Sequence, residues 1–188
     1  MDPRVRQLLL LIKTWAHDKK LIAQDKFSTY SLFMMVIFFL QKDDVKVLPK
    51  YSQMTVSPFL RNLFMKIGIN PGKMVSPLKV LQNKQILIIV LVLASGEFTT
   101  KNTSSVPELF IKFFQFYLSF DYKQAISLPF CKAVSKTTLS SDPAVRNSFI
   151  CIMDVLEPKI NLTKNVSEAT MNEFFGYGQS LLKPFLIT

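Results

Sequence analysis

Apolar and polar positions alternate with a helical period from residue 4 to residue 17. The apolar positions are Val5, Leu8, Leu9, Ile12, Trp15 and Ala16. This spacing of three and four residues predicts a helix with one buried face. Asp2-Pro3 marks its start, because proline is tolerated in the first turn. The opposite stripe is polar and consists of Arg6, Lys13, His17 and Lys20. Such a stripe is typical of a solvated helix face, and it could instead contact phosphates.

Two further stretches are strongly apolar. Residues 30–41 are hydrophobic on nearly all sides, which predicts a buried helix. Residues 86–94 are rich in β-branched side chains and are interpreted as a buried strand, with a buried helix as the alternative. A short helix is expected near residues 59–67. Crossing a bilayer takes roughly 20 consecutive apolar residues, so we expect no membrane span.

Helix-capping signals organise the C-terminal half. Ser105-Val-Pro-Glu108 is a capping box that opens a phenylalanine-rich helix. Ser167 and Glu168 cap a final amphipathic helix. Between them, residues 132–146 are rich in Ser and Thr and are predicted to form a surface loop. The pattern as a whole predicts a mainly α fold with short β elements.

Composition narrows the choice of partner and compartment. The 188 residues are 49% hydrophobic and suit one globular domain, or one domain with an attached lobe. The net charge of +10 favours an anionic partner, although many basic proteins bind no polyanion. Cys131, Cys151 and the single histidine form no metal-ligand pattern, so we expect both cysteines in the core and a reducing compartment. The N-terminus has the character of neither a signal peptide nor a transit peptide. Three Asn-x-Ser/Thr tripeptides are interpreted as unglycosylated, those of Asn102, Asn161 and Asn165.

Four segments, in this order, resemble the noncanonical poly(A) polymerases and terminal uridylyltransferases. They are DPRVRQLLLLIKTWA, FSTYSLFMMVIFFLQ with a VLP shortly after it, ELFIKFFQFYLSFDYKQAISL, and ICIMDVLEPKINLTKNVS. The second and fourth are most similar to the mitochondrial poly(A) polymerase branch. The resemblance implies the helical central domain of a nucleotidyltransferase with its poly(A)-polymerase-associated module. It divides the chain into nucleotide-facing helices (residues 1–49), a poorly matched insertion (50–105) and the associated module (106–188).

The resemblance also implies a nucleotide-binding site. Its six residues are Lys13, His17, Thr29, Tyr30, Asp154 and Glu157. Tyr30 would stack on the incoming base, and Thr29 would lie beside the phosphates; alternatively, Tyr30 only heads a buried helix with its hydroxyl at the surface. Lys13 and His17 match two basic positions that the family uses on the triphosphate. A histidine at the second position departs from the family and implies a weaker hold on the phosphates. The two residues could otherwise belong to a solvated helix face.

Asp154 and Glu157 match the carboxylates of the family's Asp-Pro-Phe-Glu element, which lines the base side of the pocket. Val155 and Leu156 stand here in place of Pro and Phe, and the carboxylates could instead be ordinary surface charges. Uridylyl-specific members carry a histidine shortly after this element, at a position that is Ile160 here. The resemblance therefore favours ATP, with UTP as the alternative nucleotide.

Catalysis in the family needs Mg or Mn ions held by three carboxylates of a β-sheet palm. The palm signature of Gly-Ser and Asp-x-Asp is absent from this sequence, and Asp43-Asp44 has no Gly-Ser partner. We therefore expect neither catalytic nor metal-binding residues in this chain, no bound metal, and no activity without the missing palm. Met1 would then be an internal methionine of a longer protein.

Two hypotheses follow for the function. In the first, the chain is the base- and triphosphate-binding half of a template-independent RNA 3′-terminal nucleotidyltransferase. That enzyme would be mitochondrial, or alternatively cytoplasmic, with the RNA 3′ end as partner and a homodimer as a possible assembly. In the second, the chain is a standalone non-catalytic helical module that binds RNA or a partner protein. A helical domain unrelated to nucleotides would bind neither ATP nor RNA.

Overall fold

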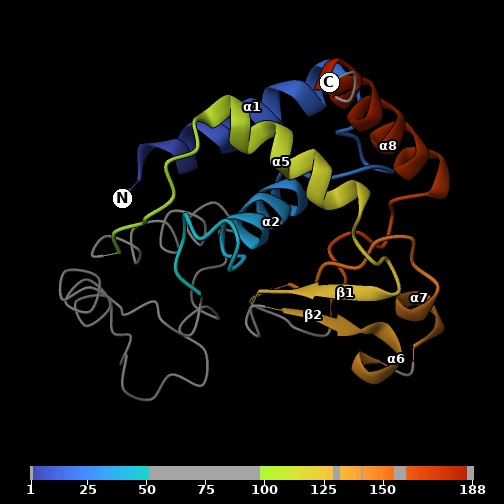
Figure 1. Ribbon diagram of the computed structural model, residues 1–188. Helices are drawn as coiled ribbons and strands as arrows, with labels where there is room; N and C mark the ends of the chain where they lie inside the picture. The colour runs from blue at the N-terminus through green and yellow to red at the C-terminus, as the bar shows by residue number, and fades with distance from the viewer. Residues whose placement is uncertain (1, 51–97, 129–131, 141, 155–159, 186–188) are drawn as a thin grey trace, which may run out of the picture.

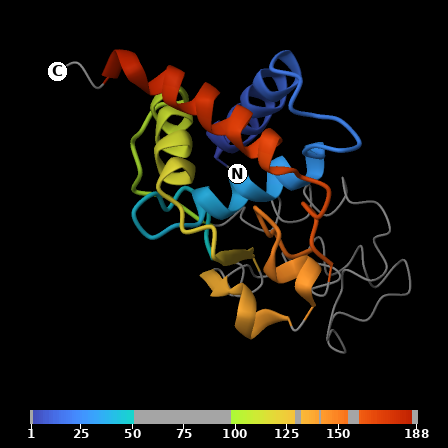
Figure 2. The same ribbon diagram turned by 90° about the vertical axis from the view of Figure 1, so that its right-hand side faces the viewer.

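The computed structural model describes residues 2–50, 98–128, 132–140, 142–154 and 160–185. Four long helices dominate its regular structure: α1 (Pro3–Asp18), α2 (Thr29–Leu40), α5 (Val106–Leu118) and α8 (Glu168–Leu182). Figure 1 shows α1, α5 and α8 above α2, and the two strands below the helices. Figure 2 shows the same separation from the side. The prediction of a mainly α fold with short β elements is confirmed.

The part of the fold below the helices in Figure 1 contains an antiparallel pair of strands. Strands β1 (Gln124–Ser127) and β2 (Lys132–Ser135) pair with Ala125 opposite Val134. The short helices α6 (Lys136–Leu139) and α7 (Pro143–Arg146) follow, and the 3-10 helix η4 (Lys183–Phe185) follows α8.

The prediction of a surface loop over residues 132–146 is wrong. Strand β2 forms by backbone pairing with β1, which needs no apolar side chains. Helix α7 begins because the Asp142 carboxylate accepts a hydrogen bond from Ala144 N at 2.9 Å, with Pro143 in the first turn. Lys136 is buried, and its ammonium donates to the carbonyl of Ser148. The polar composition of residues 132–146 therefore gave no sign that this segment forms a strand and two short helices.

Serine side chains begin two of the long helices. The predicted capping box before α5 is confirmed, since the Ser105 hydroxyl accepts from Glu108 N and the Glu108 carboxylate accepts from Ser105 N at 2.6 Å. Helix α2 begins with a similar box in which Ser31 replaces the usual glutamate. Ser28 Oγ accepts from Ser31 N at 3.0 Å, and Ser31 Oγ accepts from Ser28 N at 3.0 Å. These bonds satisfy amides that a helix start would otherwise leave without partners.

An aromatic cluster joins three of the helices in the core. The ring of Trp15 on α1 lies 4.7 Å from that of Phe114 on α5 and 5.9 Å from that of Phe174 on α8. The Phe114 and Phe174 rings are 5.7 Å apart. Helix α2 joins this core through the buried Tyr117, whose hydroxyl donates to Met35 O at 2.8 Å.

The described residues leave some predictions untested. The expected helix at 59–67, the expected strand at 86–94 and Cys131 lie outside them. Cys151 is buried as predicted. None of the helices among the described residues has both the length and the apolar character needed to cross a membrane.

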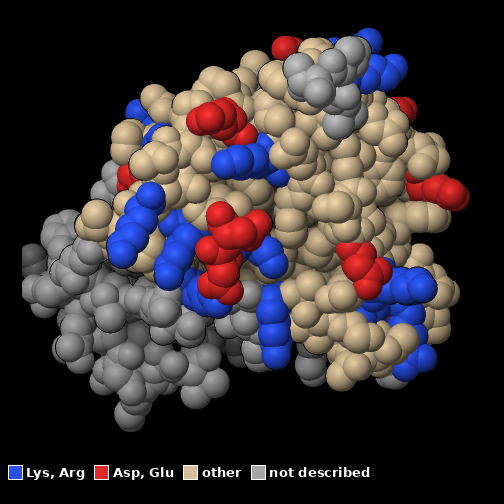
Figure 3. Space-filling view, viewed as in Figure 1, with Lys and Arg blue, Asp and Glu red and all other residues tan. Residues whose placement is uncertain are grey.

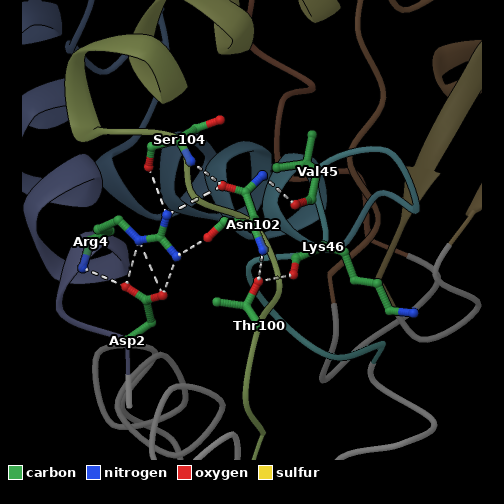
Figure 4. Close-up of polar contacts among 7 residues, drawn as sticks. All are labelled: Asp2, Arg4, Val45, Lys46, Thr100, Asn102 and Ser104. Atoms are coloured by element: carbon green, nitrogen blue, oxygen red, sulfur yellow. Dashed lines mark hydrogen bonds and ion pairs between the residues drawn. The ribbon is translucent and has the colours of Figure 1, made fainter.

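A polar network fixes the start of α1 (Figure 4). Arg4 reaches the Asp2 carboxylate through Nη2 at 2.6 Å, and Asp2 also accepts from Arg4 N at 2.9 Å. The same guanidinium donates from Nη1 to Ser104 O at 2.6 Å and to Asn102 Oδ1 at 3.2 Å. The Arg4 hydrogen bond lowers the pKa of Asp2 below its usual range.

The network continues to the segment that follows α2. Asn102 Nδ2 donates to Val45 O at 2.7 Å, and Thr100 Oγ1 donates to Lys46 O at 2.6 Å. Lys46 has a positive φ of 46°, and in Figure 4 its side chain points away from the network. The start of α1, the segment after α2 and the segment before α5 are thereby held together.

The net charge of +10 is not gathered into one patch on the face shown in Figure 3. Lys and Arg side chains lie there among Asp and Glu side chains. Some lysines are also held by neighbours: Lys50 Nζ lies 2.9 Å from Asp43 Oδ2, and Lys42 Nζ lies 5.6 Å from the centroid of the Phe116 ring. The charge thus does not point by itself to one broad polyanion surface on that face.

Candidate nucleotide-binding site

Tyr30 lies in the first turn of α2, directly after the Ser28 cap. Its ring is half-buried, and its hydroxyl donates a long hydrogen bond of 3.5 Å to Asp154 Oδ1. This contact joins residues 124 positions apart in the chain. The Tyr30 hydroxyl is therefore directed to a carboxylate, and whether the ring stacks on a base stays a prediction.

Backbone pairing places Asp154 opposite this hydroxyl. Ile126 of β1 donates from N to Cys151 O at 2.8 Å and accepts at O from Met153 N at 2.9 Å. Asp154 N then donates to Ile160 O at 3.0 Å. The chain before and after Asp154 is therefore tied to β1 and to the returning segment.

Asp154 is only 2% exposed. The alternative that it is an ordinary surface charge is wrong. A buried carboxylate is costly unless it is hydrogen-bonded, so Asp154 must be held by polar partners, of which Tyr30 is one.

Burial raises the pKa of Tyr30 well above its usual range. The nearby charge of Asp154 and the hydrogen bond to Asp154 raise this pKa further. Tyr30 is therefore a neutral phenol at physiological pH. A neutral ring with a fixed hydroxyl can offer one face to a flat, apolar ligand group.

Asn161 supports the segment that follows Asp154. Its side-chain Oδ1 accepts hydrogen bonds from Ile152 N at 3.1 Å and from Thr163 N at 3.0 Å. The Asn161 side chain is buried, and among the residues that the structure describes its Nδ2 atom has no hydrogen-bond partner. This residue shapes the turn beside Asp154, a role that its Asn-x-Thr context did not reveal.

Lys13 and His17 lie one turn apart on α1, and both are exposed. Their position fits either a solvated helix face or a phosphate contact. Thr29 is half-buried at the first position of α2, and Glu157 lies outside the described residues. The structure thus brings Tyr30 and Asp154 together. Among the described residues, Lys13 and His17 make no hydrogen bond or ion pair with that pair.

The segment between α1 and α2 carries polar residues that sequence reasoning missed. Gln24, Asp25 and Asn165 line an open hollow of about 490 Å³. Asn165 Nδ2 donates to Gln24 O at 3.3 Å, and Lys26 pairs with Glu173 of α8 at 2.8 Å. These contacts fix the path of the chain that leads to Tyr30. Their partners come from distant segments, so local pattern gave no signal of them.

Within the described ranges, no three His, Cys, Asp or Glu side chains come together in a way that could hold a metal ion. The described residues therefore do not fit the Mg or Mn ions that the family resemblance implies.

Comparison with known proteins agrees with this architecture. Residues 105–159 match the family model described as Cid1 family poly A polymerase. The mitochondrial poly(A) RNA polymerase of Drosophila melanogaster is 31% identical over 171 residues, which are 89% of this chain and 24% of that protein. Poly(A) RNA polymerase cid13 of Schizosaccharomyces pombe is 30% identical over 176 residues, covering 90% of this chain and 27% of that protein.

A solved structure shares the fold. The crystal structure of mtPAP in complex with ATPgammaS superposes with a TM-score of 0.65 and 25% identity, over 96% of this chain and 34% of that one. Fold and matched segments together define the class as a helical region of a nucleotidyltransferase. The chain belongs to the family of noncanonical poly(A) polymerases and terminal uridylyltransferases. It spans about a quarter of the two curated relatives and about a third of the solved structure.

Proposed function

We propose that this chain forms the base- and triphosphate-binding half of a template-independent RNA 3′-terminal nucleotidyltransferase of the poly(A) polymerase type. The observation that carries the proposal is the contact between Tyr30 and Asp154, which joins the start of a rigid, buried helix to a buried carboxylate. A fixed aromatic ring beside a fixed hydrogen-bond acceptor suits a nucleobase, which has both a flat face and polar edges.

In the proposed site, Tyr30 stacks on the base of the incoming nucleotide. Such stacking contributes about 1–3 kcal/mol per base and tolerates any base. Asp154 holds the Tyr30 hydroxyl and, with Glu157, lines the edge of the base. A carboxylate accepts hydrogen bonds from exocyclic amines, and adenine carries one. Ile160 offers no hydrogen-bonding side chain to a uracil edge. These two features support ATP over UTP.

The phosphates belong beside α1 and the first turn of α2. Lys13 supplies an ammonium group, and His17 stands one turn further along the same helix. Thr29 adds a hydroxyl at the N-terminal end of α2, the end where a helix favours anions. Similar solved structures, those of mtPAP with GTP and with ATPgammaS, support a nucleotide as the class of ligand.

The rest of the proposal concerns the whole protein. The acceptor is an RNA 3′ end, and the metal-holding carboxylates come from a palm outside the matched segment. Residues 1–49 and 106–188 bear the nucleotide site and the associated module. The mitochondrial relative of Drosophila melanogaster supports a mitochondrial location, with the cytoplasm as the alternative, and a homodimer is the proposed assembly.

Binding of ATP to the 188-residue chain tests the proposal. Tyr30→Ala should weaken ATP binding roughly 5- to 150-fold, the loss expected for one stacked base. Tyr30→Phe keeps the ring but removes the donor to Asp154, and should lose less ATP affinity than Tyr30→Ala. Phe185→Ala removes an exposed aromatic side chain elsewhere and serves as the control. Equal ATP affinity of the wild type and Tyr30→Ala would overturn the stacking role.

A second measurement separates this proposal from a non-catalytic module. A single-stranded RNA that binds with strong salt dependence, to a chain with no affinity for ATP, would favour the RNA-binding module. Lys13→Ala should lower ATP affinity, whereas Lys123→Ala, which removes a lysine near β1, should not.

A further inference from the structure

A small polar pocket lies just after the C-terminal end of α2. Its volume is about 60 Å³, and it is lined by Gln41, Asp43, Lys46, Leu48, Pro49 and Lys50. Tyr30 is in the first turn of the same helix, and a rise of about 1.5 Å per residue places the pocket about 17 Å from it along the helix. The pocket is therefore separate from the candidate nucleotide-binding site.

Gln41 brings an unsatisfied hydrogen-bond acceptor to this pocket. The residue is 4% exposed, and its Nε2 donates to Pro49 O at 2.9 Å. A carbonyl oxygen can only accept, so this bond fixes which end of the Gln41 amide is the nitrogen. Among the residues that the structure describes, Gln41 Oε1 has no hydrogen-bond partner. A buried acceptor without a donor is unfavourable, and a ligand with an N–H or O–H group would satisfy it.

The charged side chains of the pocket favour an anion. Lys50 Nζ lies 2.9 Å from Asp43 Oδ2. The hydrogen bond from Lys50 lowers the pKa of Asp43, and the charges of Lys46 and Lys42 lower this pKa further. Lys46 is exposed, and its ammonium forms no ion pair with a residue of the described ranges. Two ammonium groups and one carboxylate in the lining leave a positive charge in excess.

The orphan acceptor and the excess positive charge together select a class of ligand. The ammonium groups disfavour a cationic donor, so the donor belongs to a neutral group of an anionic molecule. A ribonucleotide unit joins a phosphate to a 2′-hydroxyl, which is a hydrogen-bond donor that DNA lacks. A volume of about 60 Å³ has room for the edge of a ribose and not for a whole nucleotide.

We propose that this pocket binds one ribonucleotide unit of an RNA strand. Gln41 Oε1 accepts a hydrogen bond from the ribose 2′-hydroxyl, and the Lys46 ammonium contacts the adjoining phosphate. The contact lies at the end of α2 remote from Tyr30 and makes the chain select RNA over DNA. The inference goes beyond the proposed nucleotide site, and it rests on the proposed function only in taking RNA as the source of the ribonucleotide.

Fluorescence anisotropy with a labelled oligoadenylate and its deoxy counterpart tests the inference on the 188-residue chain. The wild type should bind the RNA roughly 2- to 10-fold more tightly than the DNA, the factor expected for one hydrogen bond. Gln41→Met removes the oxygen and should lower the affinity for RNA by a similar factor while leaving that for DNA unchanged. Equal affinity of the wild type for RNA and DNA overturns the inference. A Gln41→Met loss that is equal for both strands also overturns it.

Lys46→Ala provides a test that does not disturb a buried residue. It should weaken RNA and DNA binding alike and reduce the slope of log affinity against log salt by about 0.7, the value for one phosphate contact on a single strand. Lys123→Ala removes another exposed lysine, directly before β1, and should leave that slope unchanged. An unchanged slope in Lys46→Ala overturns the phosphate contact.

Titration with ATP separates the inference from the proposed nucleotide site. Lys46→Ala should bind ATP as the wild type does, and Tyr30→Ala should keep the preference for RNA over DNA. A chain that binds ATP but neither oligonucleotide overturns the inference and leaves the nucleotide site standing. A chain that prefers RNA in this way but binds no ATP supports the pocket and overturns the nucleotide site. Loss of ATP affinity in Lys46→Ala, with RNA affinity unchanged, would assign the pocket to a free nucleotide and overturn the RNA contact.

Discussion

Replacing Asn102 by alanine should destabilise the folded chain by about 2.5–4 kcal/mol. The Asn102 side chain makes three hydrogen bonds, in which Oδ1 accepts from Arg4 Nη1 at 3.2 Å and from Ser104 N at 2.9 Å, and Nδ2 donates to Val45 O at 2.7 Å. A neutral hydrogen bond contributes about 0.5–1.5 kcal/mol and one to a charged group about 1.5–3 kcal/mol. Asn102 is half-buried, so water replaces part of the lost hydrogen bonding. The expected loss of stability is therefore in the lower half of the range obtained by adding the three bonds.

Urea unfolding followed by Trp15 fluorescence measures this loss. Trp15 is the single tryptophan and is 8% exposed in the aromatic core, so its emission should change on unfolding. Linear extrapolation then gives the free energy of unfolding in water. Asn172→Ala is the matched control, because Asn172 is exposed on α8. Alanine favours a helix by up to about 0.7 kcal/mol over such residues, so this control should be neutral or slightly stabilising.

Asn102→Asp distinguishes the contribution of the hydrogen bond that Asn102 donates from that of the two hydrogen bonds that it accepts. Aspartate keeps both acceptor contacts and gains charge opposite Arg4, but it cannot donate to Val45 O. We expect a loss smaller than that of Asn102→Ala. A loss below about 0.5 kcal/mol for Asn102→Ala, within the range of ordinary surface changes, would refute the argument that this network holds the start of α1 to the segment after α2.

Three further predictions concern the core, an acidic cap and a surface ion pair. Phe174→Ala should cost about 3–5 kcal/mol of unfolding free energy in the same urea assay, because it removes a fully buried ring; a cost under 1 kcal/mol would contradict this. The hydrogen bond from Arg4 lowers the pKa of Asp2 below its ordinary value of 3.8, so the contribution of Asp2 to stability is present above that value and is lost as the pH falls through the lowered pKa. Between pH 6 and pH 2 the wild type should therefore lose more stability than Asp2→Asn, and parallel losses would speak against it. The partly exposed pair of Lys26 and Glu173 should show a coupling below about 1 kcal/mol in a double-mutant cycle that shrinks in high salt.

The helices could be predicted because their signals are local. The apolar face of α1, the all-apolar run of α2 and the Ser105–Glu108 box each depend on residues within a few positions of one another. Apolar period and side-chain caps act over one or two turns, so the sequence displays them directly. The bounds differ from the predicted ones by a residue or so, and frayed helix ends account for that.

The segment at 132–146 could not be predicted for the opposite reason. Strand β2 depends on the backbone of β1, and the polar side chains of β2 do not alternate in a way that identifies a strand. The buried Lys136 adds to this difficulty, since lysine is almost never fully buried unless its ammonium has a partner. Here the partner is the backbone oxygen of Ser148, which no pattern in the sequence points to.

The candidate site depends both on local sequence signals and on backbone pairing between segments that are distant in the sequence. The position of Tyr30 follows from the cap and the apolar run of α2, which are local, and it could be predicted. The position of Asp154 depends on Ile126, whose backbone bonds to Cys151 and Met153 carry the carboxylate across to Tyr30. The short β elements are therefore the part of the fold that positions the carboxylate, although they contain few residues. A change that weakens the pairing at Ile126 should loosen Asp154 and leave α2 and Tyr30 in place, because the two halves of the site are held by different elements.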